Sequence, residues 1–217
     1  MKSFILMGDV VDSSKMDSQQ LMADLKSIVN KINSEESTFF PAIKSPLTIT
    51  LGDEFQGIVN SLKIGLLIIF KIDHELTGLN KSFQMRYVIS QGEIATAINK
   101  DKAYEMLGSG LTEARETLNS LKKSKTRILV SGLDGNKNEL INDALILYQS
   151  IIDNWKKKDK QVAYDLVKTF NFSTNQVDYK LVAKYHDKDP STMWRKKETL
   201  QIEQYFVARR LIMSLAS

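Results

Sequence analysis

Hydrophobic positions along the first part of the chain predict a buried strand followed by an amphipathic helix. The apolar run at 4–7 stops abruptly at turn-forming residues, which places Asp9 at the carboxyl end of the strand. From Asp17 onward, apolar residues recur at helical spacing as far as Ile32, and either Asp17 or Ser18 is a good helix N-cap. We therefore expect this helix to cover one face of a sheet.

The next segments predict two hairpins separated by a helix. Residues 47–51 and 55–59 are strand-like, and the acidic sequence at 52–54 lies at the tip between them. A largely apolar helix is expected at 62–79. Beyond it, residues 84–90 and 93–97 predict a second hairpin that turns at Gln91-Gly92.

The order β-α-β-β-α-β-β favours an α+β fold with a ferredoxin-like antiparallel sheet whose first strand lies centrally. In such a sheet the end of the first strand and the tip of the first hairpin converge. Asp9 and Asp53 are then expected to present their carboxylates to a common point.

The second half of the chain is predicted to be mainly helical. A last strand at 126–130 precedes a helix through 140–155, and three lysines at 156–158 mark a boundary. We expect two domains, an α+β domain at 1–153 and a small all-α domain at 157–217.

The helical tail has the outline of a helix-turn-helix. One helix is expected at 162–170, a second from Thr174 to Tyr185, and a third that begins at Pro190. Residues near the start of the last helix in such a motif meet base edges and phosphates. The DNA-contact candidates are Ser191, Thr192, Arg195, Lys196 and Lys197. The alternative is a scaffold whose last helix packs against the body or against a second protomer in a homodimer.

The distribution of charge supports a division into two parts. The 217 residues have a net charge of +4, but residues 154–217 carry 13 basic and 7 acidic side chains, whereas residues 1–153 carry 17 and 19. A basic tail fits contact with a polyanion, and a solvated basic surface explains it almost as well. The chain has no cysteine, and its longest apolar run is far below the roughly 20 residues of a membrane span. We expect a cytoplasmic protein without membrane contact.

Two carboxylates near a strand end form a hard oxygen site of the kind that Mg²⁺ or Mn²⁺ accepts together with substrate phosphates. Asp9 and Asp53 are the candidate metal ligands. The alternative is that Asp9 caps a loop and Asp53 occupies a hairpin turn, since aspartate is common in both places. Ser13, Ser14 and Arg86 are the candidates for binding the phosphates of a nucleotide. Glu54 is a weaker candidate, because alternation along a strand points adjacent side chains to opposite faces.

Four motifs are similar to those of class III nucleotidyl cyclases. The stretch FILMGDVVDSS at 4–14 resembles their first metal motif, and LGDEFQG at 51–57 resembles the second. RYVISQG at 86–92 is similar to their strand that leads into a glycine turn. GSGLTEAR at 108–115 resembles their Gly-x-x-Val-Asn-x-Ala-x-Arg helix. The resemblance implies a metal- and nucleotide-binding domain that is usually active as a dimer.

Three departures from the cyclase pattern weigh against cyclisation. Thr112 stands at the position of the transition-state asparagine, Arg115 falls one residue short of the catalytic arginine, and Ile49 replaces a base-reading lysine. Surface ion pairing is the simplest interpretation of Arg115. Over nearly all of its length the chain more closely resembles the SatD family of bacterial proteins.

These observations lead to one main hypothesis and two alternatives. The main hypothesis is a regulatory protein and not an enzyme, with a degenerate cyclase-like domain that binds nucleotide or metal and a DNA-binding tail. The first alternative is an active metal-dependent cyclase or phosphotransferase with unknown catalytic residues. The second is a non-catalytic scaffold for protein interactions.

Overall fold

A computed structural model of the protein describes residues 2–34, 37–79, 83–171 and 176–217. Its main sheet has the strand order β2-β3-β1-β4-β5, in which β1 pairs antiparallel with both β3 and β4, and β5 runs parallel to β4. The strands of this sheet are β1 (Lys2–Val10), β2 (Ile43–Ile49), β3 (Glu54–Val59), β4 (Met85–Glu93) and β5 (Ile128–Ser131). The prediction of a mixed α+β protein with a mostly antiparallel sheet is confirmed.

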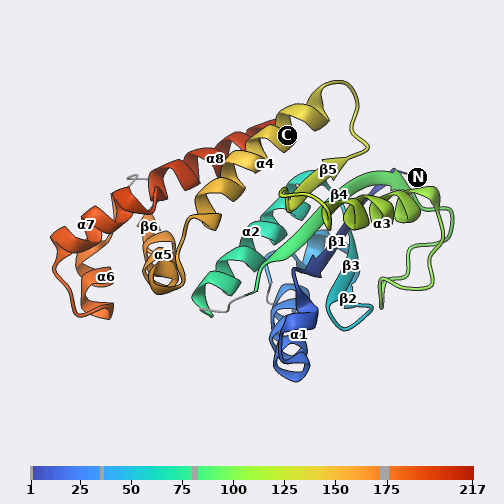
Figure 1. Ribbon diagram of the computed structural model, residues 1–217. Helices are drawn as coiled ribbons and strands as arrows, with labels where there is room; N and C mark the ends of the chain where they lie inside the picture. The colour runs from blue at the N-terminus through green and yellow to red at the C-terminus, as the bar shows by residue number, and fades with distance from the viewer. Residues whose placement is uncertain (1, 35–36, 80–82, 172–175) are drawn as a thin grey trace.

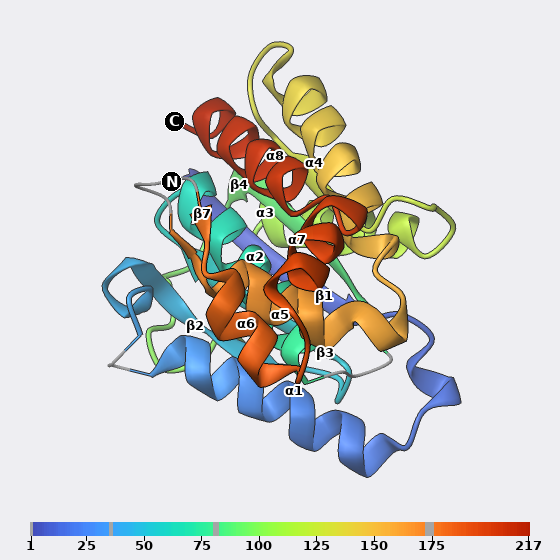
Figure 2. The same cartoon turned by 90° about the vertical axis from the view of Figure 1, so that its left-hand side faces the viewer.

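Helices pack on both faces of the sheet, and the last four form a connected group beside it (Figures 1 and 2). The helices of the first part are α1 (Ser18–Asn33), α2 (Leu62–Gly78), α3 (Ser109–Leu121) and α4 (Lys137–Asp153). Those of the tail are α5 (Lys160–Lys168), α6 (Tyr179–Tyr185), α7 (Pro190–Thr199) and α8 (Ile202–Leu215), with a small hairpin of β6 (Phe170–Asn171) and β7 (Gln176–Val177) after α5. Among the described helices, none combines the length and the apolar character that a bilayer crossing requires.

Alternation along β1 divides the core between the two faces of the sheet. Leu6 and Val10 belong to the large cluster under α1 and α2, whereas Ile5 and Met7 belong to a smaller cluster under α3. Asp9 follows the same alternation and therefore lies on the face that α3 covers. The Asp9 side chain therefore lies at one end of the smaller cluster.

The outer edge of β2 is protected by a side chain. Asn33, the last residue of α1, donates its amide to the Leu47 carbonyl at 2.8 Å and accepts the Leu47 N–H at 2.9 Å. The side-chain amide thus pairs with the strand as another strand would. The pairing of β2 with β3 is also irregular around Pro46, and both features make the edge a poor template for pairing with another chain.

The predicted second hairpin is wrong. Strand β4 runs without a turn through Gln91 and Gly92 to Glu93, and residues 94–108 form an irregular loop rather than a strand. The reason is the close packing of β4 against α3: a Cβ on Gly92 would collide with the Gly110 backbone. This glycine serves close approach of a helix and not a chain reversal.

The helices of the tail differ in part from the prediction. Helix α5 ends before Phe170, which pairs with Val177 in the small hairpin, so Val177 is a strand residue and not part of α6. The predicted start at Thr174 lies outside the described residues. The turn between α6 and α7 contains no glycine, and Asp187 takes the left-handed conformation there, with φ +49°.

The tail shares its hydrophobic core with the first part of the chain. Trp155 donates its indole N–H to the Leu200 carbonyl at 2.8 Å, and Tyr205 of α8 packs against Tyr148 of α4. Both tyrosines belong to the large cluster that also contains Phe70 of α2. The division into domains at 153 and 157 stays a prediction.

Candidate functional site

A row of charged residues crosses three strands at one level of the sheet. Asp9 of β1 lies opposite Glu54 of β3 on one side and opposite Arg86 of β4 on the other. Directly opposed residues of neighbouring strands point to the same face. All three side chains therefore share the face that α3 covers, at the end of the smaller cluster.

Asp9 and Arg86 form a buried bidentate ion pair. The Nε and Nη2 atoms of Arg86 donate to Oδ1 and Oδ2 of Asp9 at 2.8 and 3.1 Å, and only 3% of the Asp9 side chain and 13% of the Arg86 side chain are exposed. Parallel N–H···O bonds of this kind fix geometry as well as charge. The arginine holds the buried carboxylate in one orientation.

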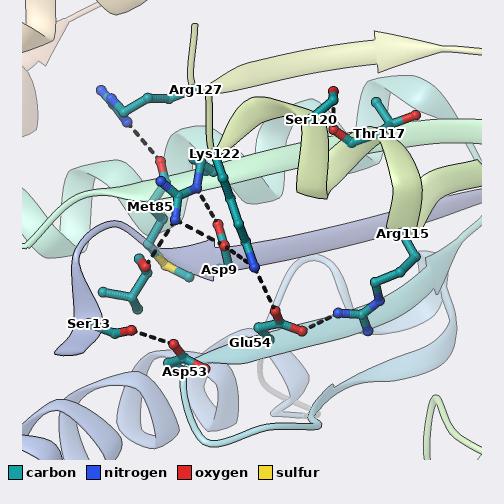
Figure 3. Close-up of polar contacts among 12 residues, drawn as sticks. Asp9, Ser13, Asp53, Glu54, Met85, Arg115, Thr117, Ser120, Lys122 and Arg127 are labelled. Carbon is teal, nitrogen blue, oxygen red and sulfur yellow. Dashed lines mark hydrogen bonds and ion pairs between the residues drawn. The ribbon is translucent and has the colours of Figure 1, made fainter. Parts of the chain in front are cut away.

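Helix α3 and the residue after it add two cations to the row (Figure 3). The Arg115 guanidinium pairs with Glu54, and the Lys122 ammonium lies 3.7 Å from both the Asp9 Oδ2 and the Glu54 Oε1. Lys122 thus bridges the two carboxylates. The side chains of Arg115 and Lys122 are 32% and 44% exposed, so both can be reached from solvent. We call Asp9, Glu54, Arg86, Arg115 and Lys122 the charged row.

Asp53 has a different partner from Asp9. Its carboxylate accepts the Ser13 hydroxyl at 2.5 Å, while its backbone carbonyl accepts the Val10 N–H. The structure therefore joins the first loop to the hairpin tip, as expected, but through Ser13 and not through Asp9. Ser14 is exposed in the short 3₁₀ turn Ser13–Lys15.

Of the five residues of the charged row, the sequence indicates Asp9 and Arg86 as site candidates and Glu54 as a weaker one, but it does not assign Arg115 or Lys122 to the site. Side chains do alternate along the strand, but the expected pairing of Asp9 with Asp53 depends on the strand register. In the observed register Glu54, and not Asp53, lies opposite Asp9. Arg115 is not a surface ion pair but reaches a buried carboxylate. Lys122 had no signal in the sequence, because its position depends on how α3 crosses the sheet.

The charged row is suited to a negatively charged ligand. The five side chains carry one net positive charge, and the two cations that solvent can reach, Arg115 and Lys122, lie beside carboxylates that are nearly buried. Within the described residues no cluster of three or more histidine or acidic side chains is arranged around a common point as metal ligands would be. Two carboxylates are nevertheless hard oxygen donors of the kind that Mg²⁺ takes with phosphates and water.

The tail places its DNA-contact candidates in two different environments. Ser191, Thr192 and Arg195 lie on the first two turns of α7, with Ser191 and Arg195 exposed. Lys196 instead donates to Asp159 at 2.5 Å. The buried Lys197 pairs with Glu203 and Glu198.

Other exposed residues lie near Arg195 in sequence and share its chemistry. They are basic or aromatic side chains of α6, the turn and α7, namely Lys180, Lys184, Tyr185, Lys188 and Trp194. Basic groups with aromatic side chains among them are typical of nucleic-acid contact. The exposed cations of the tail are therefore largely not the lysines that the sequence singled out.

Comparison with protein families gives a single assignment. The model of the SatD family matches residues 4–216. The chain belongs to the SatD family. No curated protein is similar enough to this SatD-family chain to count as a relative. The matched range includes all five residues of the charged row and the helices of the tail.

Proposed function

We propose that this SatD-family protein is a regulatory protein that binds a nucleotide at the charged row and contacts DNA through α6 and α7. The proposal treats the sheet with α1, α2 and α3 as a degenerate cyclase-like domain, and α6 and α7 as a helix-turn-helix. The observation that carries it is the bridging position of Lys122 between Asp9 and Glu54, beside two further arginines.

Phosphate groups are the ligand chemistry that best fits this cluster. Arginine presents paired donors to phosphate oxygens, and lysine adds a mobile point charge. Arg115 and Lys122 are partly exposed and can turn from the carboxylates to an incoming anion. Ser13 and the exposed Ser14 supply hydroxyl groups in the neighbouring loop.

A divalent ion fits the same cluster only together with the nucleotide. Asp9 is held by Arg86 and faces Lys122, so Mg²⁺ or Mn²⁺ would have to displace Lys122 and draw in Asp53 as the second ligand. A triphosphate favours this change, because it gives Lys122 a new anionic partner. When bound, the ion would neutralise phosphate charge. We therefore expect weak metal binding without nucleotide and tighter binding with it.

Calorimetric titration tests the nucleotide site. Nucleoside triphosphates, with and without Mg²⁺ or Mn²⁺, are titrated into wild type and into Lys122→Met, for which we expect at least a tenfold loss of affinity because a charge-assisted contact is removed. The double variant Asp9→Asn/Asp53→Asn should lose the metal-dependent part of binding. Asp134→Asn, at an exposed position outside the row, is the matched control.

Two results of this titration would contradict the proposal. One is no binding of any triphosphate by folded wild type, and the other is unchanged affinity in Lys122→Met. Analysis of the titrated samples for cyclic nucleotide or released phosphate separates the enzyme alternative from a sensor. Thr112 and Ile49 stand where a cyclase has its asparagine and base-reading lysine, so we expect no cyclic product.

Exposed cations and aromatic groups on α6 and α7 support the DNA contact. We expect binding to duplex DNA at low salt whose affinity falls steeply with salt, with a logarithmic slope of roughly −0.9 for each neutralised phosphate. The variant Lys184→Ala/Arg195→Ala should bind more weakly and with a shallower slope, whereas Lys26→Ala on the exposed side of α1 should not. A salt-independent affinity, or equal effects of both variants, would contradict the assignment.

A further inference from the structure

Helices α4 and α8 lie side by side and antiparallel in the outermost layer of the molecule (Figures 1 and 2). Two contacts fix how they are aligned. At one end Trp155 donates its indole N–H to the Leu200 carbonyl at 2.8 Å, and at the other Lys137 donates its ammonium to the Ser217 carbonyl at 3.0 Å. Because both helices rise equally per residue, Leu147 lies level with Val207.

The inner sides of this helix pair are buried, and the outer sides remain apolar. Tyr148 and Ile212 are fully buried. By contrast, exposed apolar side chains recur at helical spacing, seven residues apart on α4 and four apart on α8. These side chains are Leu140, Leu147, Val207 and Leu211, with exposed fractions of 45%, 58%, 52% and 45%. Exposed apolar side chains that recur in this way on neighbouring helices are typical of an interaction site.

The charges beside the apolar surface differ in sign between the two helices. Exposed Glu139 and Asp143 lie on α4, whereas exposed Arg210 lies on α8. Among the described residues neither Asp143 nor Arg210 has an ion-pair partner. Asp143 lies level with Leu211, next to Arg210. The surface therefore carries an acidic group and a basic group at matching heights on opposite borders.

We propose that a second copy of this chain covers the α4–α8 surface, with a two-fold axis parallel to the helices. Rotation about such an axis preserves the height of each residue and places α4 of one copy on α8 of the other. Leucines of the two copies then pack together, and Asp143 meets the partner's Arg210. A surface whose acidic and basic borders are complementary to each other is what an isologous dimer requires, whereas an unrelated partner would not need this match.

Sedimentation equilibrium of the full chain tests the dimer, with no DNA or nucleotide present, so the outcome is independent of the function proposed above. We expect a dimer for wild type and a monomer for Leu147→Lys/Leu211→Lys. Both positions are exposed, so the fold should survive, which circular dichroism checks. Leu51→Lys, at an exposed leucine far from α4 and α8 in sequence (71% exposed), should remain a dimer.

Charge reversal decides the arrangement of the two copies. Asp143→Arg and Arg210→Asp should each weaken the dimer at least tenfold, and the double variant should return to within about threefold of wild type, because the pair is rebuilt with reversed signs. A monomeric wild type at all accessible concentrations would overturn the proposal. A dimer that persists in the double-lysine variant, or a double reversal without recovery, would do the same.

Discussion

Replacing Arg86 by methionine is expected to lower the free energy of unfolding by about 3 kcal/mol at pH 7. The substitution leaves the buried Asp9 carboxylate without its bidentate partner. Breaking a buried ion pair from one side costs on the order of 3–5 kcal/mol, since the remaining charge stays out of water. Lys122 at 3.7 Å compensates in part, which favours the lower end of this range. Urea unfolding followed by fluorescence measures the change.

The double variant Arg86→Met/Asp9→Asn provides the matched comparison. Because no unpaired buried charge remains, we expect it to recover more than half of the lost free energy. Arg115→Met should cost less than Arg86→Met, because Glu54 keeps Lys122 nearby and Arg115 is more exposed. A loss below about 1 kcal/mol in Arg86→Met would show that water or Lys122 already neutralises Asp9.

Replacing Asp73 by asparagine is expected to stabilise the protein at neutral pH. Asp73 of α2 is buried between the hydroxyl groups of Tyr87 and Tyr148, which donate to it at 2.9 and 3.2 Å. Burial raises the pKa of this carboxyl to about 6, against the opposing effect of Arg127. An amide keeps hydrogen-bonding groups at this place without a charge that must be desolvated.

The sign of the pH effect follows from the raised pKa. The folded state holds the Asp73 proton up to about pH 6, whereas the unfolded chain releases it near 3.8. The stabilisation by the neutral carboxyl is therefore complete below pH 3.8 and is lost as the pH rises to about 6. The gain in unfolding free energy from Asp73→Asn should therefore grow over this pH window. It should level off at roughly 2–3 kcal/mol, because each unit of pKa difference between the folded and unfolded states corresponds to about 1.36 kcal/mol.

Denaturant unfolding of both proteins between pH 4 and 8 measures this difference. Asp134→Asn, at an exposed position before α4, should show no comparable growth with pH. If the difference in unfolding free energy between wild type and Asp73→Asn does not change with pH, the pKa of the Asp73 carboxyl is not raised in the folded protein. A less stable variant at pH 8 would mean that Arg127 needs the ionised form.

Much of the secondary structure could be predicted because each element carries its own pattern. Helix α1 has buried residues from Leu21 to Ile32 at helical spacing, and Asp17 caps it by accepting the Gln20 N–H. Strand β1 is recognisable from its apolar run. The failed hairpin at 93–97 shows the limit: Gly92 looks like a turn in sequence, but its role is set by Gly110, which lies far away along the chain.

Site residues could be predicted from the sequence only where their place depends on the local pattern and not on strand register or helix packing. Asp9, as a metal ligand, and Arg86, as a phosphate-binding residue, are both candidates from the sequence, and they lie opposite each other in the same row. The choice of Asp53 over Glu54 needed the exact pairing of β1 with β3, which a shift of one residue would reverse. Lys196 and Lys197 look like free cations in sequence, and only the packing of α7 against neighbouring elements reveals their acidic partners.

The central place of β1 also determines when the sheet can be completed during synthesis. Strand β1 is synthesised before both of its neighbours. It pairs with β3 from Phe4 to Asp9 and with β4 from Lys2 to Val10. The edge that pairs with β4 therefore stays unpaired until the ribosome has synthesised Glu93. Until then an apolar strand with open edges is exposed to other chains. Slow translation between α2 and β4 should therefore lower the yield of soluble protein, and a chaperone that shields extended apolar segments should restore it.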